Sequence, residues 1–125
     1  MAYFNKEDVR DELLKRQLKP EDIDESTAYI DDIAARLRVD PAMIPNPAPY
    51  AVRTLAMSYA LMQAALNASM NNGNGGENAA DAYELKRRVY AARVTELEGE
   101  INAQTLLGRG SQKSKFPLSI SMQRC

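Results

Sequence analysis

Histidine is absent from this 125-residue chain, and its one cysteine is the last residue, Cys125. Without histidine the chain lacks the commonest general base and metal ligand, so we expect neither a metal site nor a cofactor. One cysteine cannot form an internal disulfide, so the fold needs no oxidising compartment. The glycines at 73, 75 and 76 precede no Lys-Ser/Thr pair and make no phosphate loop. These absences predict that the protein is not an enzyme.

Long hydrophobic runs are missing too. No apolar segment approaches the ~20 residues of a membrane helix, and the first residues lack the apolar core of a signal peptide. The net charge of −1 is too small to attract nucleic acid or an anionic membrane over the whole surface. We expect a soluble protein, made in a cytoplasm, without a membrane partner. Its length allows one domain with one modest core.

The apolar residues that are present follow helical spacing in the first third of the chain. Asn5 is a good N-cap for a short amphipathic helix over residues 5–18, and Pro20 opens a second helix with acidic residues in its first turn. Asp40 and Pro41 begin one further turn. The apolar positions of the two helices are Val9, Leu13 and Leu18 in the first, and Ile23, Ile30, Ile33, Ala34 and Leu37 in the second.

Two longer helices are predicted after a stiff linker formed by Pro45, Pro47 and Pro49. The helix over 49–70 is apolar nearly all round, which is typical of a central core helix or of a subunit contact. Both interpretations apply to Met57, Leu61 and Ala64. A polar loop over 69–78 leads to a last helix predicted to run to 107 and to end at Gly108. Its heptad-like positions are Tyr83, Tyr90, Val94, Leu97 and Ile101.

These elements predict an all-α fold, a small bundle of about four helices with a long last helix, over residues 1–108. Residues 109–125 are predicted to be an extended C-terminal tail that binds a partner. The tail has four basic and no acidic side chains, which leaves −5 on residues 1–108. Its apolar residues alternate with polar ones, the period of a β-strand with one apolar face. The candidate partner-binding residues are Arg109, Lys113, Lys115, Phe116, Leu118, Ile120 and Met122.

Each charged or apolar group has two interpretations. The alternation of apolar and polar residues in the tail either reflects a strand that is added to a partner's sheet or is accidental. Lys113 and Lys115 either meet an acidic surface or DNA backbone, or keep the strand soluble. A basic cluster in the last helix either faces a channel or neighbour, or forms a solvated face paired with Glu84 and nearby acids. That cluster comprises Lys86, Arg87, Arg88 and Arg93.

The order of parts resembles the adaptor proteins at the head-to-tail interface of tailed phages. Residues 26–37 (STAYIDDIAARL) resemble that family's second helix and are followed by a proline-rich stretch at 44–47 (IPNP). Residues 49–61 (PYAVRTLAMSYAL) look like its central helix, and 83–90 (YELKRRVY) lead into a long last helix. The likeness covers about residues 20–108. The chain departs from the family in its longer loop at 69–78.

This resemblance implies a structural adaptor of a bacteriophage virion, assembled in the host cytoplasm. Such adaptors form a ring, here expected to hold twelve copies, beneath the portal protein and around the channel through which double-stranded DNA passes. Their C-terminal segment commonly reaches the portal, and a tail-side connector or tail protein lies on the other side. A head-completion protein of similar fold is the near alternative. A small helical DNA-binding or DNA-packaging protein is the alternative from another class, which the acidic residues 1–108 argue against.

Overall fold

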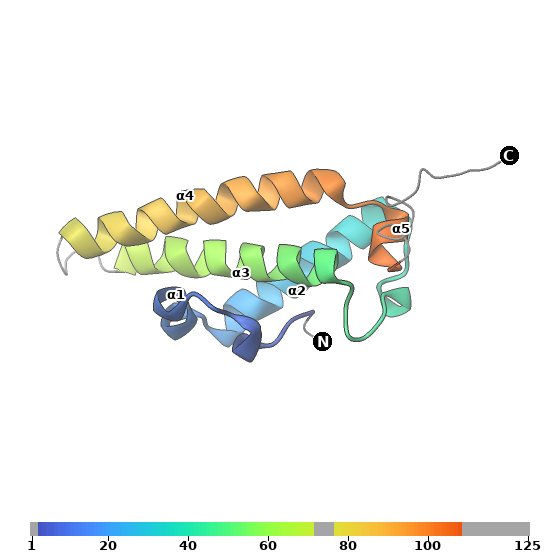
Figure 1. Ribbon diagram of the computed structural model, residues 1–125, viewed down its shortest axis with the longest axis horizontal. Helices are drawn as coiled ribbons and strands as arrows, with labels where there is room; N and C mark the ends of the chain where they lie inside the picture. The colour runs from blue at the N-terminus through green and yellow to red at the C-terminus, as the bar shows by residue number, and fades with distance from the viewer. Residues whose placement is uncertain (1–2, 72–76, 109–125) are drawn as a thin grey trace, which may run out of the picture.

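The computed structural model describes residues 3–71 and 77–108, of which residues 71 and 77–81 are described for the backbone alone. All regular structure in this part of the chain is helical, which confirms the all-α prediction (Figure 1). The predicted tail, 109–125, lies outside the described residues. The elements in chain order are η1 (Lys6–Asp8), α1 (Glu12–Gln17), α2 (Pro20–Arg36), η2 (Pro41–Met43), α3 (Tyr50–Asn71), α4 (Glu77–Glu100) and α5 (Ala103–Leu106).

Helix α3 is the centre of the bundle. It packs against α4 along its length, and α1, α2 and α5 also contact it. Figure 1 shows α4 running beside α3 and α2 passing obliquely across it. The arrangement confirms that the nearly all-apolar helix of the sequence is the central core helix, because a helix with neighbours on several sides needs few polar positions.

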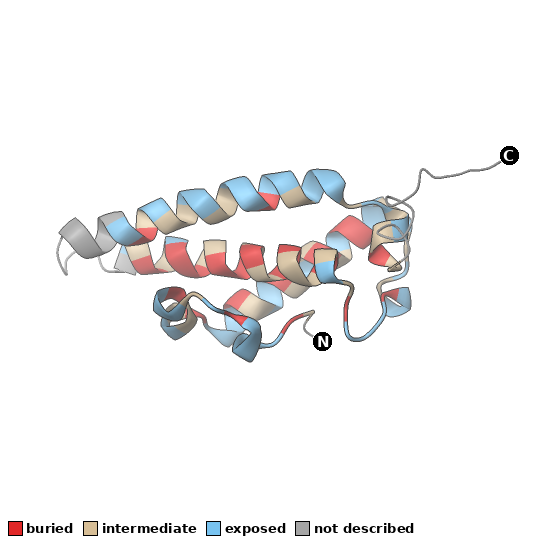
Figure 2. Cartoon of the chain, in the orientation of Figure 1, coloured by how far each residue is buried: buried red, intermediate tan, exposed pale blue. Residues whose placement is uncertain are grey.

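Burial follows this arrangement closely. In Figure 2 the buried residues are concentrated on α3, whereas most of α4 is exposed. Leu61 and Ala64 are 3% and 1% exposed, so both belong to the core of one subunit. Met57 is only half-buried. Leu66 of the same helix is 36% exposed. The alanines of α3 let its neighbours approach closely.

The predicted first helix is broken in two. Asn5 caps η1 as expected, but the chain leaves that turn at Val9, and Asp11 then caps the separate helix α1 through the Leu14 N–H. Because the helix restarts at Asp11, its buried leucine is Leu14 at 0% exposure, and Leu13 is 37% exposed. The sequence pattern had placed Leu13 in the core. A good capping residue in mid-pattern was the overlooked signal.

The second helix and the linker agree with the sequence. Pro20 occupies the first turn of α2, and Asp40 caps the turn η2 through the Ala42 N–H. The predicted apolar stripe of α2 is buried or half-buried. Ile44 and Ala48 of the proline-rich linker are each 8% exposed, so the linker covers the end of the core as well as joining α2 to α3.

The predicted last helix ends early. It stops at Glu100, and Asn102 caps the short helix α5 through the Thr105 N–H, so the prediction of one helix to residue 107 was wrong. Because the chain changes direction between α4 and α5, Leu106 points into the core, where it is fully buried. Gly108 does end the helical unit, with a φ of 80° that glycine adopts without strain. The heptad-like positions of α4 face the bundle as predicted.

Candidate interaction surfaces

The predicted basic cluster of α4 divides into differently placed groups. Lys86 Nζ lies 2.8 Å from Asp11 Oδ2, and the Tyr90 hydroxyl donates to the same oxygen at 3.0 Å. Asp11 is only 13% exposed at its side chain, and its other oxygen accepts the Leu14 N–H that caps α1. The Asp11 carboxylate therefore connects α4 to the N-terminal segment, and the ion pair of Lys86 stabilises the fold.

These contacts shift the pKa values of both acidic partners. Burial alone would raise the pKa of Asp11, but the hydrogen bonds from Lys86, from the Leu14 N–H and from Tyr90 outweigh it and lower the pKa below its ordinary value. For Tyr90, burial and then the hydrogen bond to Asp11 raise the pKa to about 12. The site is consequently held as a carboxylate with a neutral phenol at any pH near 7.

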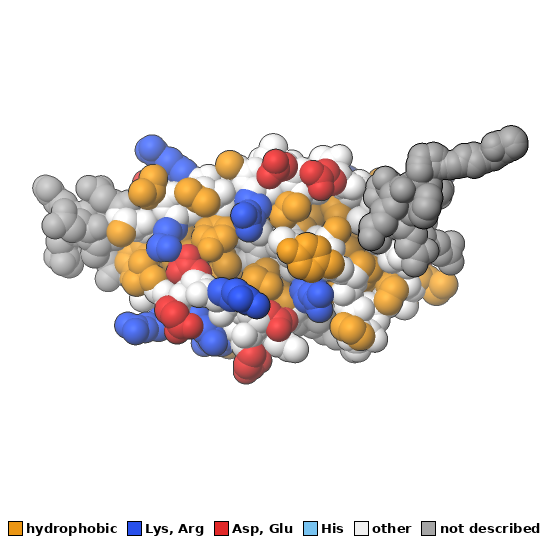
Figure 3. Space-filling view, in the orientation of Figure 1, with side chains coloured by type: hydrophobic (Ala, Val, Ile, Leu, Met, Phe, Trp, Pro, Cys, Tyr) orange, Lys and Arg blue, Asp and Glu red, His pale blue; other side chains and the backbone are white. Residues whose placement is uncertain are grey.

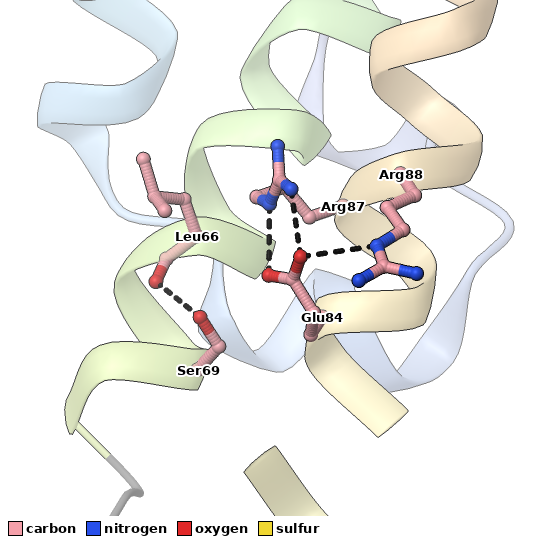
Figure 4. Close-up of polar contacts among 5 residues, drawn as sticks. All are labelled: Leu66, Ser69, Glu84, Arg87 and Arg88. Atoms are coloured by element: carbon pink, nitrogen blue, oxygen red, sulfur yellow. Dashed lines mark hydrogen bonds and ion pairs between the residues drawn. The ribbon is translucent and has the colours of Figure 1, made fainter. Parts of the chain in front are cut away.

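Arg87 and Arg88 share a single local partner. Arg87 donates two hydrogen bonds to Glu84 at 2.9 and 2.7 Å, and Arg88 donates one at 3.2 Å (Figure 4). The Arg87 bonds chiefly lower the pKa of Glu84 to about 2. The predicted pairing with Glu84 is therefore present for these two arginines, and whether their face meets a channel or a neighbour stays a prediction. Figure 4 also shows the nearby end of α3, where the Ser69 hydroxyl donates to the Leu66 carbonyl at 2.9 Å.

Arg93 lies in a different setting, at an open cleft of about 570 Å³ between α3, α4 and the N-terminal segment. Arg10 and Arg53 line the same cleft. Figure 3 shows basic and apolar side chains intermingled across the middle of the face that α3 and α4 present there. Sequence reasoning singled out Arg93 but missed Arg10 and Arg53, because the three residues come from separate segments that only the fold brings together.

Among the described residues, neither acidic residue of the cleft forms an ion pair with an arginine of the cleft. Asp8 Oδ2 accepts the Asn5 N–H at 3.0 Å, and Asp11 is the anchor for Lys86 and Tyr90. The ion pairs within residues 3–71 and 77–108 involve Arg36, Lys86, Arg87 and Arg88 and none of the three cleft arginines. We call Arg10, Arg53 and Arg93 the arginine cleft. Its guanidinium groups are available for a carboxylate or phosphate of another molecule.

An apolar strip on the outer face of α4 was also missed. Leu85 is 64% and Val89 56% exposed, one turn apart. On α3, Met70 is 72% exposed. The strip is short, and the heptad-like pattern of the opposite face obscured it in the sequence.

The point from which the predicted tail leaves is fixed. A side-chain carbon on Gly108 would lie 3.6 Å from Pro49 Cγ and 3.7 Å from Pro45 Cγ. A groove of about 340 Å³ adjoins it, lined by the three linker prolines and the last residues of the helical unit. Asn102, which caps α5, and the fully buried Leu106 hold this end in place. All seven candidate partner-binding residues of the tail lie outside the described residues.

Nowhere in 3–71 and 77–108 do three or more potential ligands gather as they would around a metal ion. No described helix is both long and apolar enough to cross a membrane.

Comparison with protein-family models, curated proteins and solved structures gives no match for this chain.

Proposed function

We propose that this protein is a structural adaptor of a bacteriophage head-to-tail connector. In this proposal copies of it form a ring under the portal protein and around the DNA channel, and the tail 109–125 binds the portal by adding a strand. The proposal extends the resemblance of residues 20–108 to such adaptors, and it assigns the protein to the virion.

The observation that carries the proposal is the position of Gly108, the residue from which the predicted tail begins. Gly108 lies beside Pro45 and Pro49 at one end of the helical unit. The segment that follows is basic and alternates between apolar and polar residues, and the described part of the chain contains no sheet that it could join. A strand that finds no edge within its own subunit pairs with the edge of a partner.

DNA would pass such a ring without being gripped. Lys86 is paired with Asp11, and Arg87 and Arg88 share Glu84, so two carboxylates offset two of the three positive charges of these residues. A weak, sequence-independent field lets a duplex slide, whereas many free phosphate contacts would hold it. This balance supports the adaptor over the alternative of a DNA-binding protein.

Removing the tail tests the proposal. Deleting residues 109–125 should leave the melting temperature nearly unchanged and abolish co-sedimentation with portal rings. A matched pair of variants locates the contact: Leu118→Ser with Ile120→Ser should lose binding, while Ser119→Ala with Ser121→Ala should keep it. If the truncated protein still binds portal at full occupancy, the tail does not attach the protein to the portal.

Binding to duplex DNA tests the alternative. At ~0.15 M salt, we expect only weak binding that does not depend on base composition and falls as salt rises. Sub-micromolar affinity with a clear sequence preference would replace the adaptor proposal with that of a DNA-binding protein.

A further inference from the structure

The arginine cleft and the outer face of α2 carry opposite charges. Before Arg36, the residues of α2 include six acidic side chains and no basic one. Glu21, Asp24, Glu25 and Asp32 are exposed, and we call these four the acidic ridge. Only Asp32 has an ion-pair partner among the described residues, Arg36 at 3.4 Å.

The ridge and the cleft lie on different sides of α3. The side of α3 toward α2 is marked by the stack of Tyr59 on Tyr29, with ring centroids 4.2 Å apart, and by the hydrogen bond from Asn67 to Asp22. The cleft side is marked by Met57. Positions two residues apart on an α-helix point about 200° apart, so Met57 and Tyr59 face nearly opposite ways. One subunit therefore cannot close its own ridge onto its own cleft.

We propose that the arginine cleft of one copy receives the acidic ridge of a second copy. Three guanidinium groups line the cleft, and among the described residues none of them forms an ion pair, either with the carboxylates of the cleft or elsewhere. Glu21, Glu25 and Asp32 share one face of α2, because they lie one and then two turns apart. Guanidinium groups bind carboxylates through two parallel hydrogen bonds. Because the two surfaces differ, the contact is head-to-tail and each copy keeps one free surface for the next.

This contact rests on the ring of the proposed function and specifies which surfaces of neighbouring copies meet. A ring requires a head-to-tail contact whose rotation closes. The two ideas remain separable, since the proposed function is tested through the tail and the portal, and the self-contact through the cleft and the ridge.

Two neutralised variants of the full chain test the contact. Arg53→Gln with Arg93→Gln removes charge from the cleft, and Glu21→Gln with Glu25→Gln removes it from the ridge. Sedimentation velocity should show concentration-dependent association of the unmodified protein that weakens as salt rises. Each variant alone should associate at least about tenfold more weakly. Circular dichroism should show unchanged helix content, because all four side chains lie at the surface or line the open cleft.

Mixing the two variants gives the decisive result. The first variant retains its ridge and the second its cleft, so an equal mixture should form dimers and nothing larger, because each dimer presents only neutralised surfaces. A mixture that stays monomeric, or one that forms larger assemblies, overturns the proposal. So does unmodified protein that is monomeric up to ~1 mM, or a cleft variant that loses duplex-DNA binding while its self-association is unchanged.

The outcomes separate the two proposals. Dimers in the mixture without any portal binding by the unmodified protein would uphold the self-contact and reject the adaptor function. Portal binding by a protein whose copies do not associate through the cleft would do the reverse.

Discussion

Lys86 and Arg93 stand two turns apart on the same side of α4, yet their surroundings differ completely. Lys86 reaches a half-buried carboxylate and a phenol, and its charge is balanced within the subunit. Arg93 opens onto the cleft with Arg10 and Arg53 and has no ion-pair partner among the described residues. The difference separates charges that hold the fold together from charges that remain for another molecule.

The largest effect should come from the anchor itself. Asp11→Ala removes the cap of α1 and leaves Lys86 and Tyr90 without their acceptor. We expect the free energy of unfolding to fall by about 2 kcal/mol, measured by urea denaturation. Asp8→Ala is the matched control, because Asp8 lines the same cleft but only caps an exposed turn. Equal losses in the two variants would contradict the anchor.

The same anchor predicts an acid-dependent stability. The pKa of Asp11 is lowered in the folded protein, so its stabilisation is complete above the ordinary aspartate value near 3.9 and is lost as pH falls through the folded value. The gap between the unmodified protein and Asp11→Ala should therefore be constant near pH 7 and should shrink as the pH falls below the ordinary aspartate value. A gap that persists unchanged in acid would mean that the carboxylate charge is unimportant.

A smaller effect is expected for Tyr90→Phe. The ring stays packed and the Lys86–Asp11 pair remains, so only one hydrogen bond is lost, at about 1 kcal/mol. The folded-state pKa of Tyr90 is raised to about 12. Its contribution is thus present below the ordinary value near 10 and is lost as pH rises toward 12. Unfolding measured between pH 7 and 12 should show a shallower decline in the variant. Tyr50→Phe, at a residue 75% exposed in the same cleft, is the control.

The smallest effect is expected for Glu84→Gln. This change releases Arg87 and Arg88, but the three charges are at the surface, where ion pairs contribute little to stability. The denaturation midpoint should not move measurably at ~0.15 M salt, where exposed pairs are screened. A destabilisation as large as that of Asp11→Ala would show that the ion pairs of Glu84 with Arg87 and Arg88 also stabilise the fold.

Much of the local structure could be predicted because its causes are local. Pro20 and Gly108 set the beginning of α2 and the end of the helical unit, and the apolar spacing identified the inward faces of α2 and α4. The errors fell at Asp11 and Asn102, where a capping side chain competes with a continuing helix. Both choices depend on what the following leucine packs against, Leu14 in one case and Leu106 in the other.

The sequence by itself determined the all-α class and the order and approximate bounds of α2 and α3. It also determined the local pairing of Glu84 with Arg87 and Arg88, because residues three and four apart on a helix are neighbours. Only the tertiary structure decided that Lys86 pairs with Asp11, 75 residues away in the sequence. It alone also brings Arg10, Arg53 and Arg93 to one cleft. Helical spacing relates side chains within a helix, whereas the packing of α4 and the N-terminal segment on α3 decides which charges meet and which remain available.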